Sequence, residues 1–222
     1  MCFSPEADLI TGALITAVGI DASRHVAHRA ERPLAGLPIL FGVHQMTEAV
    51  VWWDIEGQVP EGLGPAFAWL YLAIAFGLVP WLVPWMVRRI EPDDGRRRAM
   101  ADLVGVGVVV AILLMSTIVR GPIHVVDGGN YLVYDVPLAM GGYVTALYIL
   151  ATCGSLLLAS DRYVVVFGAI NLAAVVGLAV LLSAGVISLW CVWAAVTSVV
   201  VALHFRRTDE QRHHLVAPPA PA

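Results

Sequence analysis

Hydrophobic residues in this chain fall into seven long runs, separated by short segments that contain most of the charged residues. A helix that crosses a hydrocarbon core of ~30 Å needs ~20 largely apolar residues, because every backbone amide must be satisfied inside the segment. The pattern therefore predicts an all-α polytopic membrane bundle with seven transmembrane helices. We expect the spans at about residues 5–22, 34–54, 63–87, 99–119, 137–159, 164–183 and 186–205.

These spans form one predicted transmembrane domain, residues 1–207, and the rest of the chain has a different character. The segment 208–222 is polar and then rich in proline, a composition that is typical of a disordered tail. The first span is the weakest of the seven, but its start is well marked. Ser4 can cap the helix and Pro5 fits its first position.

The arginines indicate how the spans are oriented, because short cytoplasmic loops retain positive charge. Twelve of the 13 arginines follow the first, third, fifth or seventh run, and Arg120 is the exception. The alternate loops carry acidic residues instead, which are Asp54, Glu56, Glu61, Asp127 and Asp135. We therefore expect the N-terminus outside and the C-terminus with its tail in the cytoplasm. The expected location is a bacterial cytoplasmic (plasma) membrane, crossed several times.

Composition agrees with a membrane protein and excludes other classes. Of the 222 residues, 59% are hydrophobic and 14% are charged, and the mean hydropathy is +0.80. These values lie far from the averages of soluble proteins. A net charge of -4 provides no basic surface for nucleic acid. The first residues lack a positively charged n-region and a cleavage site, so we expect the first run to stay in the mature protein.

The long loop at 120–136 has two apolar runs on either side of Asp127-Gly128-Gly129-Asn130. A glycine-rich turn signal between two strand-like runs is typical of a β-hairpin. We expect a small hairpin that covers the outer face of the bundle as a lid.

The second span contains the strongest candidate site. Phe41, His44, Gln45, Glu48 and Trp52 follow helical spacing and share one face. An ionisable side chain inside a span is costly, so it should face the bundle interior, and function is the default hypothesis. The alternative is that Glu48 makes only a structural hydrogen bond to a neighbouring helix.

The expected catalytic residues of this site are Glu48 and His44, in a pocket that opens outward. Burial favours the protonated form of a carboxyl group, so Glu48 can donate a proton while His44 accepts or orients one. The residues expected to bind substrate lie in the same outer half, and are Gln45, Trp52, Trp190, His124 and Asp127. For a loop histidine such as His124, an ordinary surface position is the more common role.

We therefore expect a membrane-embedded enzyme that acts on a lipid or isoprenoid-like substrate by acid–base chemistry, as an isomerase or cyclase does. No Ser-His-Asp or Cys-His arrangement indicates nucleophilic catalysis. Three alternatives stay open: a zinc-dependent membrane hydrolase, a non-catalytic ligand-binding or sensory protein, and a purely structural partner whose polar residues hold helices together. The expected partners are membrane lipid and a small apolar ligand or substrate, without nucleic acid.

The sequence gives limited reason to expect a metal or a disulfide. His44 and Glu48 have the spacing that places two ligands of one metal ion on a helix face. Two ligands do not make a site, so we expect no metal or other cofactor, and zinc is the alternative. On the outer side, Cys191 lies within reach of Cys2 and the two could form a disulfide. The interpretation we favour is that Cys191 packs as a small apolar residue.

Three short motifs resemble those of an uncharacterised bacterial family of small multi-span membrane proteins, which often begin Met-Cys-Phe-Ser-Ala. They are the opening Met1-Cys2-Phe3-Ser4-Pro5-Glu6-Ala7, the segment Gln45-Met46-Thr47-Glu48 followed by Trp52, and the late Ser188-Leu189-Trp190-Cys191. Pro5 departs from the alanine of that opening. The resemblance covers most of the chain but supplies no reaction. It implies that one unit is formed by Cys2, Gln45, Glu48, Trp190 and Cys191.

A looser likeness exists to seven-span membrane hydrolases of the ceramidase and receptor-like type, which hold zinc with histidines and an aspartate. This sequence lacks their spaced histidine pair in the last span. The likeness implies the zinc-dependent hydrolase that is given above as an alternative.

Overall fold

The computed structural model describes residues 4–26, 28–129, 131–136, 141–181, 196–203 and 206. The regular secondary structure of these residues is helical, apart from one two-stranded hairpin. The helices are α1 (Pro5–Arg24), α2 (Arg32–Ile55), α3 (Leu63–Leu72), η1 (Ala73–Leu78), α4 (Val79–Ile90), α5 (Asp94–Arg120), α6 (Gly141–Leu157) and α7 (Arg162–Leu181). A further helical segment covers residues 196–203. Because α3, η1 and α4 run as one helix, the described helical stretches correspond in order to the seven predicted runs.

Three of the described helices are long and apolar enough to cross a membrane, namely Arg32–Ile55, Leu63–Ile90 and Asp94–Arg120. The described parts of α6 and α7 form shorter apolar helices. Large apolar side chains stay exposed on α5, where Ile112 is 63% and Val119 is 70% exposed. An extended apolar surface of this kind needs a lipid or protein neighbour. The fold thus indicates a membrane protein, while seven crossings and their orientation remain predictions, as does the tail at 208–222, which lies outside the described residues.

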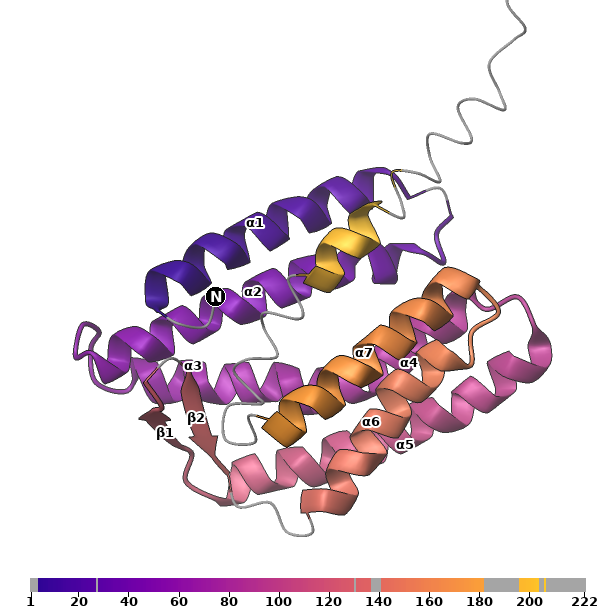
Figure 1. Cartoon of the computed structure of the whole chain (residues 1–222). Helices are drawn as coiled ribbons and strands as arrows, with labels where there is room; N and C mark the ends of the chain where they lie inside the picture. The colour runs from indigo at the N-terminus through magenta and orange to yellow at the C-terminus, as the bar shows by residue number, and fades with distance from the viewer. Residues whose placement is uncertain are drawn as a thin grey trace, which may run out of the picture.

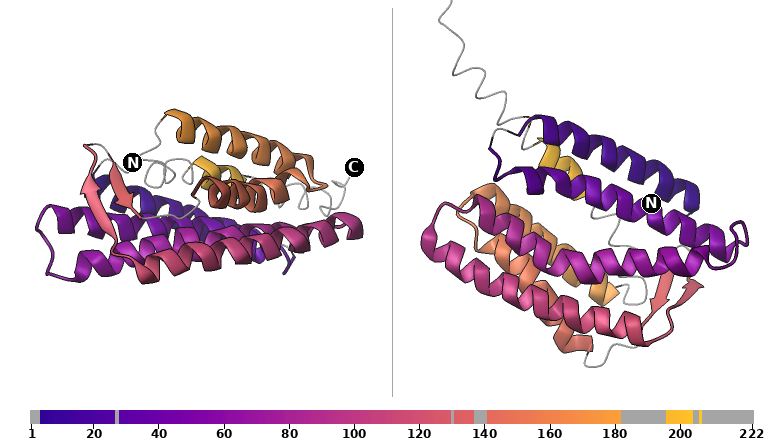
Figure 2. Two further views of the ribbon diagram at one scale, coloured as in Figure 1. Left: turned by 90° about the horizontal axis from the view of Figure 1, so that it is seen from below. Right: turned by 180° about the vertical axis from the view of Figure 1, so that it is seen from behind.

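The helices pack as antiparallel neighbours, with α1 along α2 and α5 along α4 (Figure 1). One layer is formed by α2, the α3–α4 helix and α5. The helices α6 and α7 lie on one side of this layer (Figure 2, left). The segment 196–203 returns to the start of the chain, where Ala202 packs with Ala22 of α1 and Ala35 of α2. The first and last described helices are therefore neighbours.

The two ends of the bundle differ in charge. One end carries β1 (His124–Asp127) and β2 (Leu132–Asp135), and we call it the hairpin end (Figure 1). At the opposite end, α1, α4 and α6 finish and α5 begins, beside residues that include Arg24, Arg88 and Arg96. We call this the arginine end.

Glycines permit the closest approaches between helices. A Cβ atom on Gly12 of α1 would lie 2.7 Å from the backbone oxygen of Gly42 of α2. A Cβ atom on Gly107 of α5 would meet the carbonyl group of Pro80, with 2.7 Å to its carbon, and would lie 2.8 Å from the Cα of Trp81. Small residues at such crossings are typical of helix packing in membranes. The backbones of α1 and α2, and those of α4 and α5, are therefore in direct contact.

The π-helical stretch η1 interrupts the long helix between α3 and α4. Pro80 has no N–H, so the carbonyl of Ala75 has no backbone donor in the i→i+5 pattern of a π-helix. The hydroxyl of Tyr148 on α6 donates a hydrogen bond to this carbonyl at 2.9 Å. The indole N–H of Trp81 donates to the carbonyl of Gly77, also at 2.9 Å. The Tyr148 hydroxyl thus replaces the missing backbone donor at Ala75, and it ties α6 to the distorted turn.

At the arginine end, Glu91 joins the turn before α5 to the turn before α7. Its buried carboxylate accepts hydrogen bonds from the backbone N–H of Ser160 at 2.7 Å, the Ser160 hydroxyl at 2.5 Å and the Asp93 N–H at 3.0 Å. Burial acts to raise the pKa of Glu91, but these hydrogen bonds and the charge of Arg96 lower it below its ordinary value of 4.5. Glu91 is therefore ionised at neutral pH.

Candidate functional site

The α2 helix brings four of the predicted site residues to the bundle interior. His44, Gln45, Glu48 and Trp52 are buried, and no surface of Glu48 is exposed. Their spacing places them at neighbouring positions of one helix face. This face, which we call the α2 site face, therefore points away from lipid.

Gln45 connects the α2 site face to α1. Its Nε2 donates hydrogen bonds to Oδ1 of Asp8 at 3.2 Å and to Oγ1 of Thr11 at 2.7 Å. Turning the amide over would put its oxygen against the Asp8 carboxylate, so the two hydrogen bonds fix its orientation. The Oε1 atom of Gln45 has no hydrogen-bond partner among the described residues.

Asp8 belongs to this site although sequence reasoning missed it. Its side chain has no exposed surface, and its position in the first turn of α1 also suits the helix dipole. Because the helix dipole alone accounts for an aspartate at this position, the sequence gives no reason to expect that its side chain is buried. The signal that could have revealed it is spacing, because Asp8 lies on the same buried face of α1 as Gly12 and Gly19.

The predicted hairpin is present and lies against the α2 site face. The two strands are antiparallel, and Gly129 in the turn has a φ of 93°. The hydroxyl of Tyr134 on β2 donates a hydrogen bond to Oε1 of Glu48 at 3.3 Å. The Tyr134 ring stacks on Tyr71 of α3 with 4.9 Å between centroids, and Tyr71 stacks on His44 at 4.0 Å. Three aromatic rings from β2, α3 and α2 thus form a column beside Glu48.

The other predicted site residues are not part of this cluster. His124 and Asp127 are exposed on β1. Asp127 accepts a hydrogen bond from the backbone N–H of Gly129 at 2.7 Å, a usual role of aspartate in a turn. Trp190 lies outside the described residues, and so do Cys2 and Cys191. The predicted role of Trp190 and both interpretations of the cysteines therefore stay predictions.

The described residues contain no group of three or more His, Cys, Asp or Glu side chains that could hold a metal ion. His44 and Glu48 are the two ligands that the sequence singled out. Here the ring of His44 is stacked on Tyr71 and the carboxyl group of Glu48 is bonded to Tyr134. These contacts describe a buried polar cluster with a histidine and a carboxyl group one helix turn apart.

Three buried polar atoms of the α2 site face have no hydrogen-bond partner within the described part of the chain. They are Nδ1 of His44, Oε1 of Gln45 and Nε1 of Trp52. A buried polar atom without a partner costs about 1–3 kcal/mol, and native proteins contain few of them. Three on one helix face are therefore a feature that requires an explanation.

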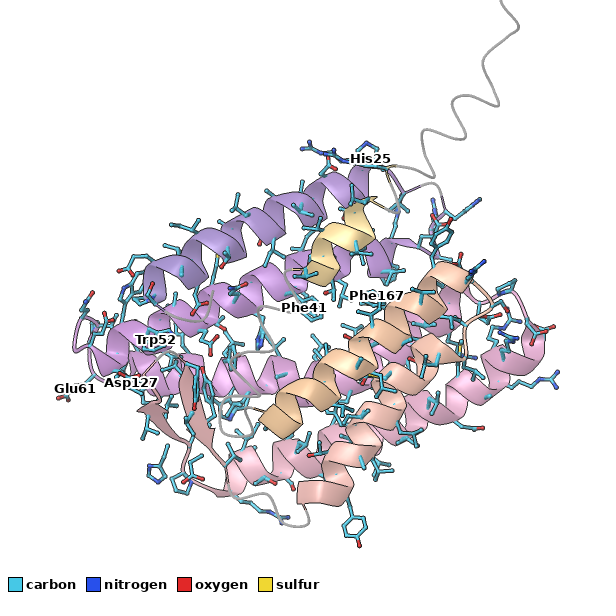
Figure 3. The ribbon with its side chains drawn as sticks, viewed as in Figure 1. His25, Phe41, Trp52, Glu61, Asp127 and Phe167 are labelled. Carbon is cyan, nitrogen blue, oxygen red and sulfur yellow. The ribbon has the colours of Figure 1, made fainter. Side chains whose placement is uncertain are left out.

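Two apolar cavities lie on the arginine-end side of this cluster. The smaller, of about 50 Å³, is lined by Phe41 of α2 and Phe167 of α7, which Figure 3 shows between these helices. The larger, of about 190 Å³, reaches the arginine end beside Glu31 and Glu91. Neither of the two is lined by His44, Gln45, Glu48 or Trp52. Phe41 lies one helix turn before His44, so the smaller cavity ends next to the α2 site face.

The two cavities are adjacent and share part of their walls. The residues that line both of them are Leu34, Val87, Leu156, Phe167 and Val201. Polar side chains also line the smaller one, namely Tyr148, Thr152 and Asn171. The larger cavity therefore lies beside the start of α2, and the smaller one lies beside the turns that lead toward the polar cluster.

Comparison with known proteins places the chain in a family. The sequence model of a family of unknown function, DUF6629, matches residues 1–215. The chain belongs to DUF6629. The resemblance to an uncharacterised family is therefore confirmed. No curated protein and no solved structure matches this DUF6629 chain.

The structure shows how part of the motif set of this DUF6629 member fits together. Gln45 and Glu48 from the second motif contact α1 and the hairpin, respectively. Ser4 from the opening motif caps α1, because its hydroxyl accepts a hydrogen bond from the N–H of Ala7 at 3.2 Å. Gln45 of the second DUF6629 motif thus bonds to Asp8, the residue that directly follows the opening motif. The third motif, at 188–191, lies outside the described residues.

Proposed function

We propose that the protein is a membrane-embedded enzyme in which Glu48 and His44 perform acid–base chemistry on a lipid or isoprenoid-like substrate. The observation that carries the proposal is the fully buried carboxyl group of Glu48, bonded to Tyr134 within a cluster that has unsatisfied polar atoms. Placing an ionisable group inside a span is costly, so such residues are typically functional. A purely structural hydrogen bond would not account for the unsatisfied neighbours.

The proposed reaction is a proton-transfer isomerisation. Protonated Glu48 donates its proton to an unsaturated carbon of the substrate, and His44 removes a proton from another carbon, so a double bond moves or a ring closes without an oxidant. The proton then returns from His44 to Glu48. The face of Trp52, and the face of Tyr71 that Tyr134 covers in the closed form, stabilise the positive charge that develops on the substrate. In the closed form Tyr134 holds Glu48, and substrate replaces this contact.

The proposal includes seven membrane crossings, with the hairpin end outside. It is supported by seven helical stretches that match the apolar runs and by the concentration of arginine at the other end. In this orientation the β1–β2 hairpin faces the exterior and acts as a lid over Glu48. The pocket is then closed by Tyr134 and opens outward when the hairpin lifts.

The substitution Glu48→Gln tests the reaction. It keeps the size of the side chain but removes the transferable proton. Lipids are extracted from membranes that contain either the wild-type protein or the variant and compared by liquid chromatography with mass spectrometry. Because isomerisation preserves mass, the readout is a change in retention time. We expect the wild type to convert one lipid into an isomer, and Glu48→Gln to lower this conversion by roughly 100-fold or more.

A matched control is Glu61→Gln, which makes the same change on the exposed loop before α3 and should leave the conversion intact. Conversion that survives in Glu48→Gln would exclude the proposed mechanism. The second candidate is a ligand-binding protein without catalysis, which the apolar cavities beside Phe41 favour. That function predicts a lipid that copurifies with wild type and Glu48→Gln alike, with no isomer in either membrane.

A further inference from the structure

We infer that the site takes a neutral head group that carries a hydroxyl group on a single apolar chain, and not a phosphate ester. The inference rests on the proposed function for the place of the site but not for its reaction. Three independent observations support it: the hydrogen-bonding character of the unsatisfied atoms, the charges around them, and the shape of the adjoining cavities.

The unsatisfied atoms require a ligand that both donates and accepts hydrogen bonds. The orientation of Gln45 is fixed by Asp8 and Thr11, so its free Oε1 is an acceptor. The indole Nε1 of Trp52 can only donate. A hydroxyl group carries both the donor that Oε1 of Gln45 needs and the acceptor that Nε1 of Trp52 needs. A phosphate dianion has acceptors only, so it would leave the oxygen of Gln45 unsatisfied.

Charge around the site also disfavours a phosphate. The carboxyl groups of Asp8 and Glu48 have no exposed surface, and six more acidic residues lie at the hairpin end. The only arginine of α5 at this end is Arg120. Residues 1–3, 130, 137–140 and 182–195, which are outside the described part, include no lysine or arginine. A buried anion without a paired cation is strongly unfavourable.

The cavities define the apolar part of the ligand. The smaller cavity begins one helix turn from His44, at Phe41, and it shares Phe167 with the larger cavity. A cavity of about 150 Å³ holds one benzene molecule, so the larger volume of about 190 Å³ suits a short length of one chain. Two acyl chains of a phospholipid do not fit this volume. A short length of a single isoprenoid or fatty chain does, and we place the oxygen of that chain at the α2 site face.

Farnesol and farnesyl monophosphate test the inference, because they share one chain and differ only in the head group. The full-length protein is purified in detergent, and tritiated farnesol is bound at equilibrium with either unlabelled compound as competitor. We expect farnesol to compete at least tenfold more strongly than the phosphate. Farnesol that does not bind, or a phosphate that binds as tightly, would overturn the inference without the need for any variant.

The substitution Trp52→Phe locates the head group. It removes the N–H donor but keeps an aromatic ring, and we expect about tenfold weaker farnesol binding, the effect of one lost hydrogen bond. Trp69→Phe makes the same change at a 43% exposed position of α3 and should leave binding unchanged. Equal effects in the two variants would contradict the assigned position.

The two proposals fail in different ways. If farnesol is preferred but Glu48→Gln still converts lipid, the head group is correct and the acid–base reaction is wrong. If Glu48→Gln loses conversion but the phosphate binds as well as farnesol, the reaction stands and the head group is wrong.

Discussion

The substitution Gly107→Ala tests how closely α5 approaches α4. The loss of stability that it should cause can be estimated from the structure. The added methyl group would lie 2.7 Å from the carbonyl carbon of Pro80 and 2.8 Å from the Cα of Trp81, and would meet the Pro80 oxygen as well. These are backbone atoms, so no side chain can turn aside. Pro84 cannot donate to the Pro80 carbonyl in an α-helix, and this carbonyl is the group that faces Gly107.

Carbon atoms normally pack at about 3.5–4.0 Å, so the two helices would have to separate by roughly 1 Å. A gap of this size forfeits a quarter to a half of the dispersion energy of each atom pair at the crossing. Overpacking of this kind typically lowers the free energy of unfolding by about 1–3 kcal/mol. For a chain of this length, that corresponds to a fall of about 2–12 °C in the unfolding midpoint.

The control is Gly105→Ala, two residues away on the same helix. A Cβ atom there meets nothing within 4 Å, and alanine is a better helix former than glycine by about 1 kcal/mol. Alanine should therefore lower the unfolding midpoint at position 107. At position 105 it should leave the midpoint unchanged or raise it. Thermal unfolding of both variants in one detergent gives the comparison. An unfolding midpoint of Gly107→Ala equal to that of Gly105→Ala would refute the close contact.

Two further substitutions test the polar contacts that tie α6 to its neighbours. Glu91→Gln weakens the contact with Ser160, and we expect the free energy of unfolding at pH 7 to fall by about 1–3 kcal/mol. Because the folded-state pKa of Glu91 is below 4.5, its contribution to stability is present above pH 4.5 and is lost as the pH falls through the lowered pKa. The stability curves of the wild type and Glu91→Gln should therefore converge in acid, and curves that stay apart would contradict this. Tyr148→Phe leaves the carbonyl of Ala75 without its donor and should lower the free energy of unfolding by a similar amount. The control Tyr143→Phe, at a 74% exposed position, should have little effect in the same thermal assay. Equal stability of these two variants would argue against the hydrogen bond.

The helical fold follows from the sequence because an apolar run of about 20 residues has few alternatives to a helix in lipid. The inward direction of the α2 site face follows equally from the spacing of His44, Gln45 and Glu48. The hairpin is predictable because Gly128 and Gly129 lie between strand-like runs. In each case a short segment of sequence contains all the physical information that is needed.

The features that sequence reasoning missed depend on contacts between distant segments. Gly105 and Gly107 look alike in the sequence, and only the path of α4 determines that one packs and the other is exposed. Asp8 looks like a residue chosen for the helix dipole until α2 covers it. The hairpin register puts Tyr134 opposite Val125 on the inward face and His124 on the other face, and a shift of one residue would reverse the faces. Asp127 is exposed because it lies at the turn, where it bonds to Gly129. Periodicity alone does not fix these choices.

The contact between the first and last described helices has a consequence for synthesis. Arg206 forms an ion pair with Asp21 at 2.6 Å across 185 residues of chain. At about 5–20 residues per second, the ribosome needs roughly 10–40 s to supply that partner. Meanwhile α1 and α2 already possess their own glycine contact and the bonds of Gln45 to Asp8 and Thr11. A message broken in its last third would therefore leave an assembled pair of helices with one uncovered flank, which is the kind of surface that membrane quality-control proteases recognise.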